Sequence, residues 1–333
     1  MEHLYSNRVK QVKASEIREI LKLTQRPDII SFAGGLPAPE LFPIEAMKVV
    51  SQKVLTDMGC EALQYGTTEG YDPLRDKVAE RMRRAGIPTV KEDILITNGS
   101  QQGLDFSGKI FLNPGDYVLC ESPSYLGAIN AFKAYECSFK EIETDSEGMV
   151  LSHLESVIQS TPNVKFIYVI PDFQNPSGRT WSEARRKGVL KLANQYNLVV
   201  IEDNPYGELR FDGEWIAPMK SFDTEGRVVY LGTFSKTFSP GIRIGWVMAS
   251  PEILNKYILV KQGADLQSSS MSQRELNTYI ELYDFDAHID SIKAVYKKRR
   301  DLMIETIKSE FPDVAQYDVP NGGLFAWVKL PSH

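Results

Sequence analysis

The chain has 333 residues, of which 42% are hydrophobic and 25% charged, as in ordinary globular proteins. Its formal net charge is −6, so no basic excess exists to neutralise nucleic-acid phosphates. The cysteines (Cys60, Cys120 and Cys137) are too widely spaced for a disulfide framework, and the four histidines form no cluster typical of a metal site. No signal-peptide core and no apolar run of about 18 residues occur, so we expect a cytoplasmic protein without membrane or nucleic-acid partners.

Helices are expected first along the chain. Residues 13–25 carry apolar side chains at helical spacing, with Ser15 as a suitable N-cap. The segment 31–43 is rich in glycine and proline and predicts irregular structure. Two further helices are predicted at 43–58 and 71–84.

From residue 94 onward, short apolar runs alternate with helical stretches. Strands are predicted at 94–98, 117–121, 138–143, 165–170, 198–203, 228–232 and 244–250. The intervening helices are predicted at 100–112, 124–135, 150–160 and 182–196. Strands that alternate with helices form a sheet covered on both faces, so we predict an α/β fold with a mostly parallel seven-stranded sheet between helices. Ligands of such sheets bind at the carboxyl ends of the strands.

After residue 252 the sequence becomes helical again, with long helices predicted at 271–285 and 289–309. It closes with a single strand-like stretch at 321–331. Because an isolated strand cannot bury its face alone, we expect the small α/β domain to be incomplete in this chain. The expected domains are an N-terminal arm with part of the small domain (1–42), a large domain (43–252), and a linking helix with a partial small domain (253–333).

The segment TFSKTFSPGIRIGW places Lys236 just after a predicted strand. A lone lysine there is usually a surface residue with a buried stem. However, Thr233, Ser235 and Arg243 supply hydroxyl and guanidinium donors suited to a phosphate. An amine beside a phosphate site is what pyridoxal 5'-phosphate (PLP) needs to form a Schiff base.

Asp203 ends a fully apolar predicted strand, where burying an unpaired carboxylate is costly. It could simply cap a helix or turn a loop. Its functional alternative is an ion pair with the protonated pyridine nitrogen of PLP, which makes the ring an electron sink. Tyr206 and Asn175 could then hydrogen-bond the ring oxygen, although Asn175–Pro176 is also typical of a turn. X-Pro bonds lose most of the trans preference, so a cis bond is allowed there.

Two further strand ends carry weaker signals. In ITNGSQQG a glycine turn leads into a helix, where Ser100, Gln101 and backbone N–H groups could bind an anion or merely cap the helix. In ESPSYLGA, Tyr125 could stack on the pyridine ring or pack in the core.

Taken in order, these motifs resemble the class I/II aminotransferases of PLP fold type I. The resemblance is closest to the branch of 2-aminoadipate (LysN-like) and kynurenine/α-aminoadipate aminotransferases, and it runs from about residue 12 to the end. The matching segments are SEIREILKLTQRPDIISFAGGLPAPELFP, LQYGTTEGYDPLR, LITNGSQQGLD, ESPSYLGAINAF, PDFQNPSGRT, IEDNPYGELRF, YLGTFSKTFSPGIRIGW and KQGADLQ.

The resemblance implies a homodimer with shared active sites that transfers an amino group from an amino acid to a 2-oxo acid, such as 2-oxoglutarate, by ping-pong chemistry. Lys236 would be the Schiff-base lysine and Asp203 the partner of the pyridine nitrogen. The remaining cofactor contacts would be made by Asn175 and Tyr206 (ring oxygen), Tyr125 (stacking), Ser100, Gln101, Thr233 or Ser235, and Arg243 (phosphate), and Tyr65 from the partner subunit. Arg18, Gly35 and Asn175 would lie near the substrate.

The resemblance also bears on the length of the chain and on an alternative function. The family continues into a stretch with an arginine that binds the substrate α-carboxylate, and this sequence stops at His333 before such a residue, so a truncated chain is expected. Related domains also serve as PLP-binding effector modules of MocR/GntR-type transcription regulators. That alternative function requires an N-terminal DNA-binding domain, for which the residues before 12 are too few.

Overall fold

The computed structural model describes residues 1–11, 28–32 and 34–331. The helix predicted at 13–25, and with it Arg18, lies outside the described residues.

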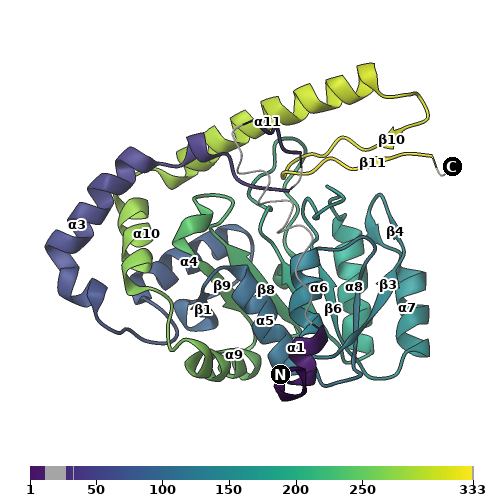
Figure 1. The fold of residues 1–333 in the computed structure, drawn as a ribbon, viewed down its shortest axis with the longest axis horizontal. Coiled ribbons are helices and arrows are strands. Elements are labelled where there is room, and N and C mark those ends of the chain that lie inside the picture. The colour runs from purple at the N-terminus through teal and green to yellow at the C-terminus, as the bar shows by residue number, and fades with distance from the viewer. Residues whose placement is uncertain (12–27, 33, 332–333) are drawn as a thin grey trace.

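A seven-stranded sheet forms the centre of the molecule (Figure 1), in the order β1-β9-β8-β7-β6-β2-β3. The strands are β1 (Ile94–Thr97), β2 (Tyr117–Glu121), β3 (Ser138–Ile142), β6 (Val164–Val169), β7 (Val199–Asp203), β8 (Val228–Thr233) and β9 (Gly245–Met248). Only β9 runs antiparallel to its neighbours within this sheet. The mostly parallel seven-stranded sheet predicted from the sequence is therefore confirmed.

Helices cover both faces of this sheet (Figure 1). The helices of the described residues are α1 (Asn7–Gln11), α3 (Ile44–Leu63), α4 (Asp72–Arg84), α5 (Ser100–Phe111), α6 (Leu126–Lys133), α7 (Leu151–Ser160), α8 (Glu183–Gln195), α9 (Pro251–Ala264), α10 (Ser270–Leu282) and α11 (Phe285–Glu310), of which α3 packs on α10 rather than on the sheet. The sequence had not separated α9 from the helical region around it. A short hairpin of β4 (Thr144–Asp145) and β5 (Gly148–Met149) precedes α7.

The inner strands of the sheet are apolar on both faces because each face is buried by helices, whereas the edge strand β3 is mostly exposed. In β6, Phe166 and Tyr168 join the hydrophobic cluster that includes α5, α6 and α9. The alternate residues Ile167 and Val169 join the cluster that includes α7 and α8. This period of two decides which side chains meet at the strand ends.

The long helix α11 has 26 residues and spans about 39 Å. Phe285 and Ile289 pack into the cluster of α3, α4 and α10, while Ile292 and Tyr296 pack into that of α5, α6 and α9. Its far end leads to the strands β10 and β11 (Figure 1).

The sequence predicted one isolated strand within 321–331, and this prediction is wrong. Strand β11 (Val328–Lys329) pairs antiparallel with β10 (Gln316–Tyr317). The partner is only two residues long, so it carries no alternating pattern that could reveal it in the sequence.

No helix in the described part of the chain is both long enough and apolar enough to cross a membrane.

Candidate active site

The carboxyl ends of β7 and β8 bring the central charged residues together. Asp203 is the last residue of β7, and Lys236 follows the end of β8 by three residues. These strands are parallel neighbours, with Asp203 opposite Leu231. The two side chains interact electrostatically, since Lys236 lowers the pKa of Asp203.

Lys236 is half-buried, and its Nζ donates a hydrogen bond to the carbonyl oxygen of Gly35 at 2.9 Å. Burial and the neighbouring Arg243 guanidinium lower the pKa of Lys236 to about 8, against the attraction of Asp203. The amine can therefore exchange a proton near neutral pH, as a general base must.

Asp203 is 2% exposed and neither caps a helix nor turns a loop. Its Oδ2 accepts a hydrogen bond from the Tyr168 hydroxyl at 3.0 Å, whereas its buried Oδ1 has no hydrogen-bond partner among the described residues. Burial raises the pKa of Asp203 to about 7, although Tyr168 and Lys236 both lower it. Oδ1 is thus a buried acceptor that lacks a donor.

Asn175 and Tyr206 meet beside this carboxylate. Burial raises the pKa of the Tyr206 hydroxyl, the neighbouring Asn175 side chain lowers it, and Asp203 also interacts electrostatically with Tyr206. Tyr206 is 4% exposed, and its ring packs edge-on against Phe325 with centroids 5.6 Å apart. The Asn175–Pro176 bond is cis, as the sequence allowed, and so is Ser122–Pro123.

The start of α5 forms a cradle with almost no side chains. Gly99 has φ 75°, and a Cβ there would lie 2.6 Å from Nη2 of Arg243. Arg243 is exposed and donates from Nη2 to the carbonyl oxygen of Asn98 at 2.8 Å. A Cβ on Gly245 would lie 2.7 Å from the Gly99 backbone, so only glycine permits this approach. Ser100 begins the helix, whose free N–H groups and dipole favour an anion.

Hydroxyl groups follow β8 close to this cradle. Thr233 Oγ1 lies 2.9 Å from Ser235 Oγ and also accepts a hydrogen bond from the Ser235 backbone N–H. Both hydroxyls precede Lys236, so a ligand held by them would lie near the amine.

Tyr125 and Gln101 form the remaining wall. The Tyr125 hydroxyl donates to Gln101 Oε1 at 3.3 Å, and Gln101 Nε2 donates to the Gly127 carbonyl oxygen at 3.0 Å. A Cβ on Gly127 would lie 2.3 Å from Tyr125 Cζ, so the ring lies directly over this glycine. Tyr125 is half-buried, unlike a residue of the inner core.

Tyr65 is the predicted site residue that stands apart from this cluster among the described residues. Tyr65 follows α3 and is 78% exposed. Arg18 lies outside the described residues. Gly35 lies in the site, because its carbonyl oxygen accepts the hydrogen bond from Lys236 Nζ. A Cβ on Gly35 would lie 2.6 Å from the Phe325 ring.

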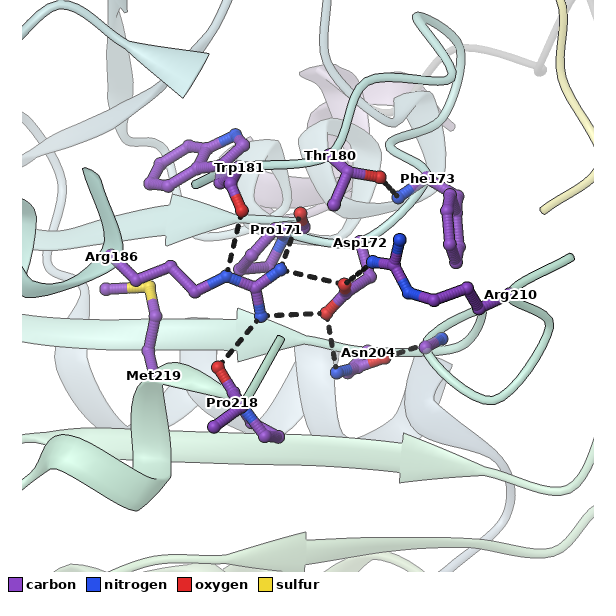
Figure 2. Close-up of polar contacts among 12 residues, drawn as sticks. Pro171, Asp172, Phe173, Thr180, Trp181, Arg186, Asn204, Arg210, Pro218 and Met219 are labelled. Carbon is purple, nitrogen blue, oxygen red and sulfur yellow. Dashed lines mark hydrogen bonds and ion pairs between the residues drawn. The ribbon is translucent and has the colours of Figure 1, made fainter. Parts of the chain in front are cut away.

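Behind the site lies a buried ion network centred on Asp172 in the loop after β6 (Figure 2). Arg186 of α8 binds its carboxylate with both terminal nitrogens, at 2.7 and 3.0 Å, and both side chains are almost fully buried. Asn204 Nδ2 donates to Asp172 at 3.3 Å, and Arg210 Nη2 lies 3.6 Å from Oδ1. The network therefore joins the loop carrying Asn175 to the residue after Asp203.

Each donor group of the Arg186 side chain has a hydrogen-bond acceptor. Besides Asp172, it donates to the carbonyl oxygens of Pro171, Trp181 and Ala217, each at 3.2 Å. These contacts use all five guanidinium N–H groups. The side chain is thus a structural tie between separate loops.

The sequence did not indicate four residues as part of the site: Tyr168, Phe325, Asp172 and Arg186. For Tyr168 a signal existed, because a tyrosine in an apolar strand usually finds a partner for its hydroxyl. No such signal exists for the Asp172–Arg186 pair, since its members are joined only by the tertiary fold.

Glu121, at the end of β2, allows a test of the buried electrostatics. Its Oε1 accepts a hydrogen bond from Trp181 Nε1 at 2.9 Å, and burial raises its pKa to about 7. The folded protein therefore holds a proton that the unfolded chain releases as pH rises from about 4.5 to 7. This group should lower the free energy of unfolding over that range by about 3 kcal/mol.

In Glu121→Gln the neutral side chain keeps an oxygen for Trp181 and cannot ionise. We expect the cofactor-free variant to match the wild type at pH 4 and to be more stable at pH 7.5, measured by chemical denaturation. Parallel stability curves for the two proteins would contradict a raised pKa.

A strand-end lysine, a buried carboxylate with a free oxygen and a glycine-built anion cradle define the class of PLP enzymes of fold type I. The profile of the family described as "Aminotransferase class I and II" matches residues 28–333, so the chain belongs to this family. It is therefore an aminotransferase that uses PLP and exchanges an amino group between an amino acid and a 2-oxo acid. The resemblance and the fold class predicted from the sequence are confirmed.

Individual relatives agree with this assignment. The chain is 48% identical to "Aromatic-amino-acid aminotransferase 1" of Thermococcus litoralis, covering 99% of this chain and 80% of that protein. It is 42% identical to "2-aminoadipate transaminase" of Thermus thermophilus, covering 96% and 80%. The crystal structure of Pyrococcus horikoshii kynurenine aminotransferase superposes with a TM-score of 0.94 at 43% identity, covering 99% and 83%. Transcription regulators match only at about 28–31% identity, so the regulator alternative has distant support alone.

The residues present fit the cofactor. Oδ1 of Asp203 is a buried acceptor without a donor, as a protonated ring nitrogen requires. The Gly99 cradle and Arg243 offer donors to a phosphate.

Proposed function

We propose that this aminotransferase prefers aromatic amino acids as donors and 2-oxoglutarate as acceptor. The observation that carries the proposal is Phe325, whose ring lies against both Gly35 and Tyr206 beside the Lys236 amine. An aromatic wall next to the reacting amine favours a flat apolar side chain. The names of the relatives at 48% and 43% identity, which refer to aromatic amino acids and kynurenine, support the same donor class.

We assign the cofactor contacts residue by residue as part of this proposal. Lys236 would hold PLP covalently and Asp203 its ring nitrogen, with Asn175 and Tyr206 at the ring oxygen. The phosphate would be bound by Ser100, Gln101, Thr233, Ser235 and Arg243. Tyr125 would stack on the ring.

We also infer a cytoplasmic homodimer with shared sites. Tyr65 is 78% exposed, and α3 before it exposes Ile44, Val49, Leu55 and Leu63, each by half or more of its surface. An exposed apolar helix of this kind is typical of a subunit interface. Tyr65 of the partner subunit would then reach the phosphate.

When bound, PLP supplies an aldehyde that links to amines and a ring that withdraws electrons. Lys236 Nζ takes the proton from the substrate Cα and later returns it, since its lowered pKa leaves a fraction of the amine neutral at physiological pH. Asp203 keeps a negative charge facing the ring nitrogen. Buried Tyr206 and the Phe325 ring exclude water from the reacting atoms.

The substrate preference can be tested with the PLP-loaded protein and 2-oxoglutarate. We expect kcat/KM for phenylalanine, tyrosine and kynurenine to exceed that for 2-aminoadipate and glutamate by at least about 10-fold, as an apolar pocket can discriminate. Phe325→Ala should lower kcat/KM for the aromatic donors selectively and so reduce this ratio. A preference for 2-aminoadipate would overturn the aromatic assignment.

A further inference from the structure

We propose that Tyr168 is a positioning residue, which fixes the Asp203 carboxylate so that its free oxygen faces the ring nitrogen of the cofactor. The inference rests on the proposed role of Asp203. Tyr168 itself would touch neither cofactor nor substrate.

The strand register brings the two side chains together. Tyr168 of β6 lies opposite Ile201 of β7, and both join the cluster of α5, α6 and α9. Asp203 is two residues beyond Ile201, so it points to the same face of the sheet. The Tyr168 hydroxyl reaches it diagonally and donates to Oδ2 at 3.0 Å.

This contact leaves the carboxylate with one oxygen bonded and the other free. Tyr168 is 1% exposed and Asp203 2% exposed, so water does not compete for either group. The Tyr168 ring is held edge-on against Phe132, with centroids 5.6 Å apart. Since its ring is packed and Oδ2 is occupied, the carboxylate presents Oδ1 as its remaining acceptor.

The same hydrogen bond favours the ionised form of the carboxylate. Burial raises the pKa of Asp203, and the opposing influences are the Tyr168 donor and the Lys236 charge. The hydroxyls of Tyr206 on β7's loop and Tyr230 on β8 also interact electrostatically with Asp203. Of these groups, only Tyr168 is hydrogen-bonded to the carboxylate among the described residues. Without it, Asp203 would hold its proton to a higher pH and lose its charge toward the ring nitrogen.

The test is Tyr168→Phe, which removes one oxygen and keeps the packed ring. The control is Tyr257→Phe, because the Tyr257 hydroxyl lies 2.7 Å from Ser107 Oγ in the same cluster and is equally buried. Both variants and the wild type would be freed of cofactor and titrated with PLP at pH 6 and pH 8, followed by absorbance. Thermal melting of the cofactor-free proteins reports any loss of fold.

Tyr168→Phe should raise the Kd for PLP about 10-fold at pH 8, the usual effect of losing a hydrogen bond to a charged group. The loss of affinity relative to the wild type should be larger at pH 6, because Asp203 of the variant holds its proton more tightly than Asp203 of the wild type. Tyr257→Phe should change Kd less than about 2-fold at either pH. In an Asp203→Asn background, which carries no charge to support, the Phe substitution should have no further effect on Kd.

The outcomes separate the inference from the proposed function. Equal Kd values for wild type and Tyr168→Phe at both pH values would overturn the positioning role while leaving the Asp203 assignment intact. An undiminished effect of Tyr168→Phe in the Asp203→Asn background would also overturn it, since the substitution would then act through packing. If Asp203→Asn alone binds PLP like the wild type, the proposed role of Asp203 fails.

Discussion

Replacing Lys236 with alanine is expected to abolish covalent attachment of PLP and to lower the rate of transamination by at least about 1000-fold. The reason is that this amine is half-buried, has a pKa lowered to about 8, and lies beside Asp203, whose Oδ1 has no hydrogen-bond partner in the described part of the chain. No other described lysine combines these features. After reduction with borohydride, mass spectrometry should detect the cofactor mass on the wild type and not on the variant.

A matched control for Lys236→Ala is Lys308→Ala, since Lys308 is exposed in the last turn of α11. This variant should retain both the added mass and the wild-type rate. Attachment of the cofactor to Lys236→Ala through another lysine, with turnover near the wild-type rate, would refute the assignment.

The largest expected loss of stability follows from Arg186→Met. The substitution leaves the buried Asp172 carboxylate without its bidentate partner and removes one donor from each of three carbonyl oxygens. Breaking a buried ion pair in this way typically costs about 3–5 kcal/mol. Chemical denaturation of the cofactor-free protein should measure a fall of that size in the free energy of unfolding.

The neighbouring Lys187→Met is the control for this experiment. Lys187 lies on the same helix, but its ion pair with Glu183 is more than half exposed, so the expected change is below about 1 kcal/mol. In the double variant Asp172→Asn/Arg186→Met neither charge of this buried pair remains, and part of the stability should return. Strictly additive losses would contradict the description of this network as a coupled pair.

The sequence was sufficient to predict the sheet and the residues at its carboxyl edge. Asp203 and Lys236 stand out because each ends an apolar strand, and polar groups at such positions converge in a parallel sheet. Tyr168 could not be predicted in the same way, because its role depends on the register between β6 and β7. The pairing of β10 with β11 was missed because two residues show no period.

Some predictions remain open for physical reasons. The division into domains at residues 42 and 252, the partner-subunit role of Tyr65 and the substrate role of Arg18 stay predictions. The domain division depends on movements between parts of the chain, and the role of Tyr65 depends on the assembly of two subunits. Asp172 and Arg186 are separated by 14 residues and meet only through the packing of α8 on the sheet.

The glycine cradle of Gly99 and Gly245 has a consequence for how this enzyme can diverge. Its shape is set by backbone atoms in contact, so mutation of side chains cannot gradually enlarge or shift it. By contrast, the wall beside the Lys236 amine depends on a replaceable side chain, that of Phe325. New substrate specificities should therefore arise while the glycine cradle stays unchanged, by exchange of residues that lie beside the Lys236 amine.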